Sequence, residues 1–468
     1  MKRQKFTTRS IATLRRRSIN WEEDIKPLFS EETLEWVVET PFFRGRYVNL
    51  DNAATTSAFH DVEERIKDAL VTYGSVHRGS GQKSKISTDG YEQAREVVRE
   101  FVGASPENYV IFTKNTTEAI NHAASLWAGK SGKVLVSDIE HSSNLLPWMK
   151  YNEVIQYKTN PDGTVDLAEV ERVFEENGYI KLLTITGSSN VTGYKPPVHE
   201  LAKIAHKHGA KILVDVCQLI QHQKIEMFDD EDTAHLDFIS FSGHKMYAPF
   251  GAGVLVGPKS FFDQVMPYQI GGGNLPYITR KLEIKIFKTV QAHDPGTPNT
   301  VGTIAIASAI KVLESIGYDS IEEYESALVS EAYDKLSTLE KVVIYVPKEK
   351  LGSVLPFDIQ GVDHYLVAEI LAQEYGIGVR AGSFCTYELM RKMKKVSDEQ
   401  DQSIANEVDN GITKNIPGVI RASFSLINNY EDVERFVSAV SEIAQLGKAH
   451  YTSRYQKDET NGKWSLKS

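Results

Sequence analysis

The chain has 468 residues, of which 41% are hydrophobic and 25% charged, as is ordinary for a soluble globular protein of two or three domains. A net charge of −10 disfavours nucleic-acid partners, and the lack of an apolar run of about 20 residues disfavours a membrane span. Two cysteines exclude a disulfide framework and suit a reducing compartment, so we expect a cytoplasmic protein.

The first segment of the chain is strongly basic. The stretch "MKRQKFTTRSIATLRRRS" holds seven Lys and Arg and no acidic residue. We predict that residues 1–45 form a basic N-terminal extension and arm outside the folded domains. An Arg-rich, acid-free start also resembles an organelle transit peptide, and this alternative stays open.

Residues 46–309 alternate between short apolar runs and helical patterns. Continuously apolar, β-branched runs predict strands at 109–113, 133–138, 181–186, 211–216, 237–242 and 253–257. Between them, "TTEAINHAASLWAG" and "PPVHELAKIAHKHG" have helical spacing and end in glycine. This alternation predicts an α/β fold with a mostly parallel sheet covered by helices.

The pattern changes near residue 300. "TIAIASAIKVLESIG" predicts a long buried helix that leads into a smaller α+β domain over residues 310–446, with strands in "KVVIYVP" and "GIGVRA". Within this domain, the charged segment 391–417 predicts a surface helix and a loop. The polar residues 447–468 predict a disordered tail.

Several polar side chains follow the predicted strands, where parallel α/β sheets bind ligands. Thr116 and Thr117 open a helix and suit a phosphate, although ordinary helix capping explains them as well. His141 and Asn190 follow the next two of these strands. Asp215 ends an apolar strand and therefore needs a cationic partner, which a Lys or Arg would also provide.

A lysine follows the strand at 237–242. Lys245 stands next to Ser242 and His244, and a buried lysine is a candidate for Schiff-base chemistry, whereas a solvated one is not. Together with a phosphate cradle, a carboxylate and an imidazole ring, it fits pyridoxal 5'-phosphate (PLP). The H-x-H pair His206 and His208 lies in a predicted surface helix, and we expect no metal site.

These residues lie in motifs that resemble the cysteine desulfurases, which are class V aminotransferase-like enzymes of PLP fold type I. The resemblance covers about residues 46–446. It runs through "YVNLDNAATT", "SVHRGSG", "TTEAIN", "IEHSSNLLPW", "SSNVTGY", "LVDVCQ", "SFSGHKMYAPFGAGVL", "GTPNTVG", "GVRAGSFC" and "IRASFSLINN". It implies a seven-stranded, mostly parallel sheet in a large PLP-binding domain at 46–309.

The resemblance also implies a role for each residue at the cofactor. Lys245 would form the Schiff base, His141 would stack on the ring, Asp215 would pair with the pyridinium nitrogen, and Gln218 would bind the ring oxygen. The phosphate would lie among Thr117, Ser242 and His244, with Thr116 adjacent. Thr297 would reach the phosphate of a neighbouring subunit, which implies a homodimer with shared sites.

Four further residues are implied at the substrate: Asn190, Arg421, His77 and Arg380. The Arg421 fork would take the carboxylate of the amino acid. Cys385 matches the nucleophilic cysteine, whose thiolate would take sulfur from L-cysteine and leave L-alanine. The persulfide would then pass to a sulfur acceptor, for example in iron–sulfur cluster assembly.

Two departures leave other activities open. Ser383 and Phe384 stand where the short-loop desulfurases have two histidines. Cys385 and Arg421 are 36 positions apart, and the charged segment 391–417 fills most of that gap. That segment would cover the site, dock an acceptor, or be a solvated decoration. The alternatives are a selenocysteine lyase, C–S lyase or aminotransferase that does not use Cys385, and a sulfur-carrier or scaffold protein without turnover.

Overall fold

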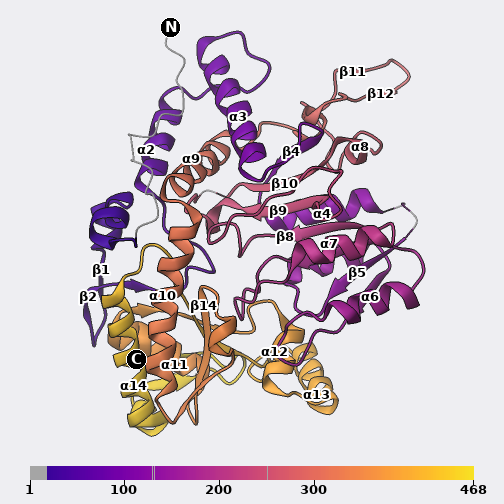
Figure 1. Ribbon diagram of the computed structural model, residues 1–468. Coiled ribbons are helices and arrows are strands. Elements are labelled where there is room, and N and C mark those ends of the chain that lie inside the picture. The colour runs from indigo at the N-terminus through magenta and orange to yellow at the C-terminus, as the bar shows by residue number, and fades with distance from the viewer. Residues whose placement is uncertain (1–17, 129, 131, 250, 468) are drawn as a thin grey trace.

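A computed structural model describes residues 18–128, 130, 132–249 and 251–467 (Figure 1). The basic residues 1–17 lie outside the described residues, and with them most of the predicted N-terminal extension. The arm that follows contains η1 (Trp21–Ile25), η2 (Lys26–Leu28), α1 (Glu31–Leu34), β1 (Val37–Glu39), β2 (Arg44–Arg46) and β3 (Val48–Asn49).

A seven-stranded sheet forms the centre of the large unit, with strand order β4-β10-β9-β8-β7-β5-β6. Its strands are β4 (Asn108–Thr113), β5 (Lys133–Ser137), β6 (Val154–Tyr157), β7 (Ile180–Thr186), β8 (Lys211–Asp215), β9 (Phe238–Ser242) and β10 (Gly253–Pro258). β10 is antiparallel to both of its neighbours, β4 and β9, and the other six strands all run in the same direction. All six predicted strands are present, and β6 is an edge strand that the sequence did not reveal.

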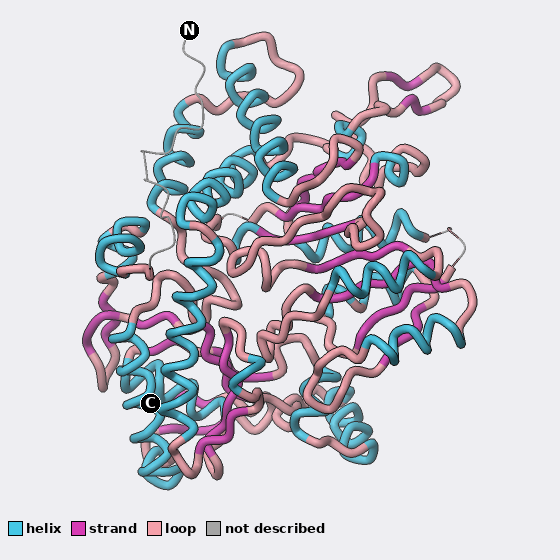
Figure 2. The backbone as a smooth tube through the Cα atoms, viewed as in Figure 1, coloured by secondary structure: helices cyan, strands magenta, loops and turns pink. Residues whose placement is uncertain are grey.

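Helices cover both faces of this sheet (Figure 2). They are α2 (His60–Val71), α3 (Gln82–Phe101), α4 (Thr116–Trp127), η3 (Ser142–Asn144), α5 (Leu146–Tyr151), α6 (Leu167–Glu176), α7 (Val198–Lys207), η4 (Gly243–Lys245), α8 (Lys259–Phe262), η5 (Val290–His293) and α9 (Thr300–Ile316). A short hairpin, β11 (Tyr277–Ile278) with β12 (Ile284–Lys285), projects from this unit.

Two apolar clusters hold these layers together. On β10, Val254 and Val256 pack in one cluster and Leu255 in the other, as the period of two in a strand requires. The first cluster includes residues of α9 and α7, and the second includes residues of α4. Both faces of the strands are therefore buried, which explains their continuous hydrophobicity.

The smaller unit contains a four-stranded antiparallel sheet, in the order β13-β14-β17-β16. Its elements are α10 (Tyr318–Ser337), β13 (Val342–Ile344), η6 (Lys348–Lys350), β14 (Val354–Ile359), α11 (His364–Tyr375), β15 (Ile377–Gly378), β16 (Arg380–Gly382), β17 (Val419–Ser423) and α14 (Tyr430–Tyr451). The short strand β15 pairs with β3 of the N-terminal arm, so the arm joins the smaller unit.

The charged segment and the tail differ from expectation. Residues 391–417 contain the end of α12 (Tyr387–Lys394) and a second helix, α13 (Asp398–Asp409), rather than one helix and a loop. The prediction of a disordered tail at 447–468 is wrong, because β18 (Tyr455–Lys457) and β19 (Trp464–Leu466) form a hairpin. Tyr455 is buried and its hydroxyl donates to Glu374 at 2.9 Å, so composition alone was misleading.

Among the described residues, no single helix has both the length and the apolar character to cross a membrane. The helices α9 and α10 satisfy both criteria only when taken together, and they are bent by 82° at the break between them.

Candidate active site

A cavity of about 360 Å³ lies at the carboxyl ends of the large-sheet strands, next to the smaller unit. Eight residues predicted at a cofactor line it: Thr116, Thr117, His141, Asp215, Gln218, Ser242, His244 and Lys245. So do four residues predicted at the substrate or as nucleophile: Asn190, Arg380, Cys385 and Arg421. The residues that follow strands of the large sheet meet at its carboxyl edge, as expected for parallel strands, and the smaller unit adds Arg380, Cys385 and Arg421.

One end of the cavity is built on the start of α4. Asn115 caps this helix by accepting from the Glu118 N–H. The Thr116 N–H donates to Ser242 Oγ at 2.8 Å, and the hydroxyls of these two residues lie 2.7 Å apart. Thr117 Oγ1 lies 2.8 Å from Ser143 Oγ. Hydroxyls around a helix N-terminus form a site for a phosphate.

Asp215 lies deeper in the cavity, at the end of β8. Its carboxylate accepts from the Cys217 N–H at 3.1 Å, and burial raises its pKa above the ordinary value. The nearby charge of Lys245 offsets this burial only in part, and among the described residues no salt bridge joins Asp215 to a lysine or arginine. A buried carboxylate without a salt bridge suits a ligand that brings a protonated nitrogen.

Lys245 and His141 face the same cavity from the turns after β9 and β5. Burial, together with the cations of Lys245 and Arg421, lowers the pKa of His141 to about 4. The ring is therefore neutral at neutral pH. Its Nδ1 accepts from the Ser143 N–H at 3.1 Å, which assigns the proton to Nε2. Burial and Lys245 likewise lower the pKa of His244 to about 4.

Arg421 on β17 reaches the cavity from the smaller unit. Its Nη1 donates to the Asn190 carbonyl at 2.9 Å and its Nη2 pairs with Asp51 at 3.1 Å. Its buried Nε–H has no hydrogen-bond partner among the described residues. Burial lowers the pKa of this guanidinium to about 10, so it stays cationic, and the free donor suits the carboxylate of a ligand. Arg380 pairs with the same Asp51 at 3.0 Å.

Cys385 is exposed at the cavity, whereas Cys217 is buried. Burial and the nearby Asp215 raise the pKa of Cys217 to about 11, so that thiol stays protonated. The Cys385 carbonyl accepts from both the N–H and the hydroxyl of Ser142, each at 2.8 Å. The loop that carries Cys385 is therefore tied to the turn that carries His141.

Phe384, the residue before Cys385, is also held by contacts with its neighbours. The Phe384 carbonyl accepts from Asn190 Nδ2 at 2.8 Å, and its ring lies 4.7 Å from the Arg421 guanidinium. Phe384 and Cys385 both have positive φ, 55° and 58°. Asn190 Oδ1 also accepts from Thr386, so the amide of Asn190 is occupied by the loop, although Asn190 lines the cavity as predicted.

Two predicted residues do not line the cavity. His77 pairs with Glu92 at 2.7 Å, and Thr297 is exposed in the segment before α9. The roles given to them by resemblance therefore stay predictions.

The pair His206 and His208 does not act together. His208 pairs with Glu171, whereas His206 lies with His235 and Asp237, a group whose ligand atoms fall within 4.8 Å. Lys211 already pairs with Asp237 at 2.5 Å, so this carboxylate has a cation.

Sequence reasoning missed three contributors to this site. Ser143 and Asp51 stand inside quoted motifs and Asn115 directly precedes one. A hydroxyl contact, an ion pair across 370 positions and a helix cap nevertheless depend on the fold. Phe384 was noted only as a departure from a histidine. The contact of its ring with the Arg421 guanidinium is a structural reason for an aromatic residue at this position.

Comparison with known proteins agrees with this arrangement. The model of the family described as aminotransferase class-V matches residues 48–436. The chain belongs to this family. A probable cysteine desulfurase from Halalkalibacterium halodurans is 35% identical over 84% of this chain and 92% of its own length. A cysteine desulfurase from Escherichia coli is 31% identical over 80% and 87%.

Solved structures place the chain among the class V cysteine desulfurases of PLP fold type I. The apo cysteine desulfurase from Thermococcus onnurineus NA1 has a TM-score of 0.75 at 31% identity and covers 85% of this chain and 95% of its own. An S-sulfonic acid form of an Escherichia coli cysteine desulfurase has a TM-score of 0.72 at 27% identity and covers 86% and 95%. The predicted fold class and family are confirmed.

The class V desulfurases are PLP-dependent, and the cavity fits that cofactor. Asp215 is a buried carboxylate lacking a lysine or arginine partner among the described residues, which matches a pyridinium N–H. The first turn of α4 with Ser242 matches the phosphate. Lys245, whose ammonium forms no ion pair within the described ranges, is available to hold the cofactor covalently.

Proposed function

We propose that this protein converts L-cysteine to L-alanine and collects the sulfur as a persulfide on Cys385. The observation that carries this proposal is that an exposed thiol lines the same cavity as Lys245, Asp215 and the free Nε–H of Arg421. An amino acid, an electron-withdrawing cofactor and a nucleophilic sulfur would therefore meet in one place.

PLP, when bound, supplies the electron sink that labilises bonds at the substrate. Arg421 binds the substrate carboxylate through its unused Nε–H and stays cationic because its pKa, although lowered, is about 10. His141 lines the cavity with a neutral ring whose proton is on Nε2, so it donates there and can accept only after giving that proton up. Asp215 stays ionised when it faces the ring nitrogen, because that cation offsets its burial.

The sulfur step balances without an external oxidant. The Cys385 thiolate attacks the sulfur of bound cysteine, and a new S–S bond forms as the S–Cβ bond breaks. The electron pair stays on Cβ, which takes a proton and becomes the methyl group of alanine. Cys385 then carries a persulfide, and a thiol of an acceptor can remove its outer sulfur.

The wider setting is also a proposal. The exposure of Cys385 supports transfer to a sulfur-acceptor protein, and iron–sulfur cluster assembly is one use for that sulfur. The exposed Thr297, which does not line this subunit's cavity, supports a homodimer in which it reaches the partner's phosphate. A persulfide carrier needs reduced thiols, which supports the cytoplasm, while import by the basic N-terminus is the alternative.

Spectra and labelling test this function. We expect a yellow protein whose visible band is lost in Lys245→Ala. Cys385→Ala should keep the band and its change on adding cysteine, but release no alanine. Mass spectrometry should find the persulfide on Cys385, with Cys217 unmodified. Normal turnover of cysteine by Cys385→Ala would instead favour a C–S lyase, and turnover of selenocysteine alone would favour a selenocysteine lyase.

A further inference from the structure

The helix α12 begins directly after the loop that carries the thiol. Thr386 is its N-terminal cap, so the position of α12 determines where the residue before it, Cys385, can lie. On one face of α12, Leu389 and Met390 are fully buried and pack in a cluster with Ile139. The helix is thus seated against the turn that follows β5, and not a solvated decoration along its whole length.

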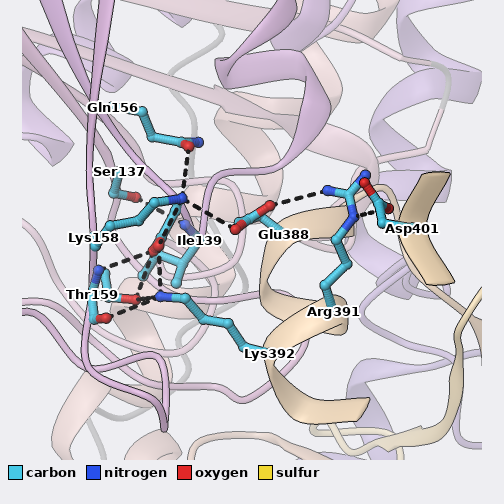
Figure 3. Close-up of polar contacts among 10 residues, drawn as sticks. Ser137, Ile139, Gln156, Lys158, Thr159, Glu388, Arg391, Lys392 and Asp401 are labelled. Atoms are coloured by element: carbon cyan, nitrogen blue, oxygen red, sulfur yellow. Dashed lines mark hydrogen bonds and ion pairs between the residues drawn. The ribbon is translucent and has the colours of Figure 1, made fainter. Parts of the chain in front are cut away.

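An ion pair adds to this apolar contact, between a buried carboxylate and Lys392, whose side chain is 19% exposed. Asp138 follows β5 and its side chain is completely buried. Its Oδ1 accepts from the Thr159 N–H at 3.1 Å and hydroxyl at 2.7 Å, while its Oδ2 lies 2.6 Å from the Lys392 ammonium on α12. Lys392 also donates to the Thr159 carbonyl at 3.0 Å and to its Oγ1 at 2.9 Å (Figure 3). The Lys392 ammonium therefore makes two hydrogen bonds to Thr159 and an ion pair, without a hydrogen bond, to Asp138.

The other ion pairs of α12 are more exposed, and the least exposed of them joins Lys394 to Asp358, with side chains 26% and 15% exposed. Lys158, which is 60% exposed, lies 3.2 Å from Glu388, and Arg391 pairs with Asp401 of α13 at 2.6 Å (Figure 3). Exposed pairs of this kind contribute little to stability. Removal of Lys392 would leave the buried Asp138 with only the exposed Lys158 as a cation, whose ammonium lies 3.9 Å from Asp138 Oδ2. Among these contacts, the pair of Lys392 with Asp138 is therefore expected to contribute most to holding α12 in place.

The same turn after β5 holds both ends of this arrangement. It contains Asp138, which binds Lys392, and Ser142, which binds the Cys385 carbonyl twice. His141, on the cavity wall, lies between them in sequence. The thiol loop is thus fixed to one turn at two points, one on each side of Thr386.

We propose that Lys392 is a positioning residue, whose ion pair with Asp138 keeps α12 seated and thereby holds the Cys385 thiol at the cavity. This inference rests on the proposed function for its catalytic consequence, but not for its structural one. Lys392 does not line the cavity. Its effect should therefore fall on the sulfur step alone and not on the binding of PLP or cysteine.

The first test compares Lys392→Met with Lys395→Met in the PLP-loaded enzyme. Lys395 is the exposed residue that caps the same helix, and its side chain forms no ion pair within the described ranges, so it is a matched control. In single-turnover experiments, Lys392→Met should form the Cys385 persulfide about 10- to 100-fold more slowly, because a small misplacement of a nucleophile is costly. The visible spectrum and the cysteine concentration for half-maximal rate should be unchanged, and Lys395→Met should match the wild type. An unchanged rate in a folded Lys392→Met enzyme overturns the proposal.

Two further variants separate positioning from stability. Lys392→Arg keeps the charge and should recover part of the rate. The double variant of Asp138→Asn with Lys392→Met removes both charges and should regain thermal stability while persulfide formation stays slow. If the double variant regains both stability and rate, the pair is merely structural and the proposal fails.

Alkylation of Cys385 by iodoacetamide gives a readout that needs no turnover. If the loop is freed, Cys385 should be alkylated at least threefold faster in Lys392→Met than in the wild type. In Lys395→Met it should be alkylated at the wild-type rate. If this difference is seen but the wild type forms no persulfide from cysteine, the proposed function fails, while the structural role of Lys392 in holding α12 is supported. Equal alkylation rates in all variants overturn the proposal that Lys392 holds the thiol loop in place.

Discussion

Asp215 is expected to lower the stability of the PLP-free protein while it strengthens PLP binding. Its buried carboxylate has the Cys217 N–H as a donor and no lysine or arginine ion pair within the described ranges. A buried charge that lacks its partner costs at least about 1–3 kcal/mol. Asp215→Asn should therefore raise the unfolding free energy of the PLP-free protein by about 1–3 kcal/mol. It should weaken PLP binding by a comparable amount, about 10- to 100-fold.

The pH dependence of the unfolding free energy provides a second test of this prediction. Burial raises the pKa of Asp215, so the folded state keeps its proton at a pH where the unfolded state has lost it. The unfolding free energy then falls as pH rises from about 3.9, the ordinary pKa of aspartate, through the raised pKa. Each unit of difference amounts to about 1.4 kcal/mol. This contribution should be absent from Asp215→Asn.

Urea unfolding of the PLP-free forms between pH 4 and 8, together with PLP titration by absorbance, measures both effects. The control is Asp237→Asn, because that carboxylate is paired with Lys211 and its pKa is lowered. Its loss should destabilise the protein. If Asp215→Asn also destabilises the PLP-free protein, Asp215 has a partner inside the fold and our reasoning about the cavity is wrong.

Two further predictions concern the ring at the cavity wall and the C-terminal hairpin. Burial and two nearby cations lower the pKa of His141 to about 4, so its contribution to stability is lost as pH falls from about 6.5 towards 4. His141→Gln should reduce this acid sensitivity in urea unfolding, and an NMR titration of His141 with a midpoint near 6.5 would contradict it. Deleting residues 453–468 should lower the unfolding free energy by about 2–4 kcal/mol, because Tyr455 is buried and bonded to Glu374. An unchanged melting temperature would mean that the hairpin does not dock in solution.

The sequence was sufficient for the large sheet and for most of the cavity, for a physical reason. Its strands are buried on both faces, so each is a continuous apolar run that stands out from its surroundings. Parallel strands end at one edge, so residues that follow different strands, such as Thr116, Asp215 and Lys245, must come together. The edge strand β6 is exposed in part and gave no such signal.

The sequence was insufficient where contacts depend on distant segments. The tail at 447–468 is polar, yet Tyr455 and Arg454 find Glu374 on α11, about 80 positions earlier. The charged segment after Cys385 has the composition of a solvated surface, but Lys392 in it pairs with the buried Asp138. Composition shows that these residues are polar or charged, but only the fold shows which distant residues they contact.

The backbone of the thiol loop explains why so many contacts surround it. Phe384 and Cys385 adopt positive φ in succession, which costs about 1–2 kcal/mol for each residue other than glycine. Such a conformation persists only when its surroundings determine it more than once. Here Asn190 holds the Phe384 carbonyl, Ser142 holds the Cys385 carbonyl and Lys392 holds the helix that follows. A thiol held in this way has little freedom to leave the cavity, so a sulfur acceptor would have to approach Cys385 where it is exposed.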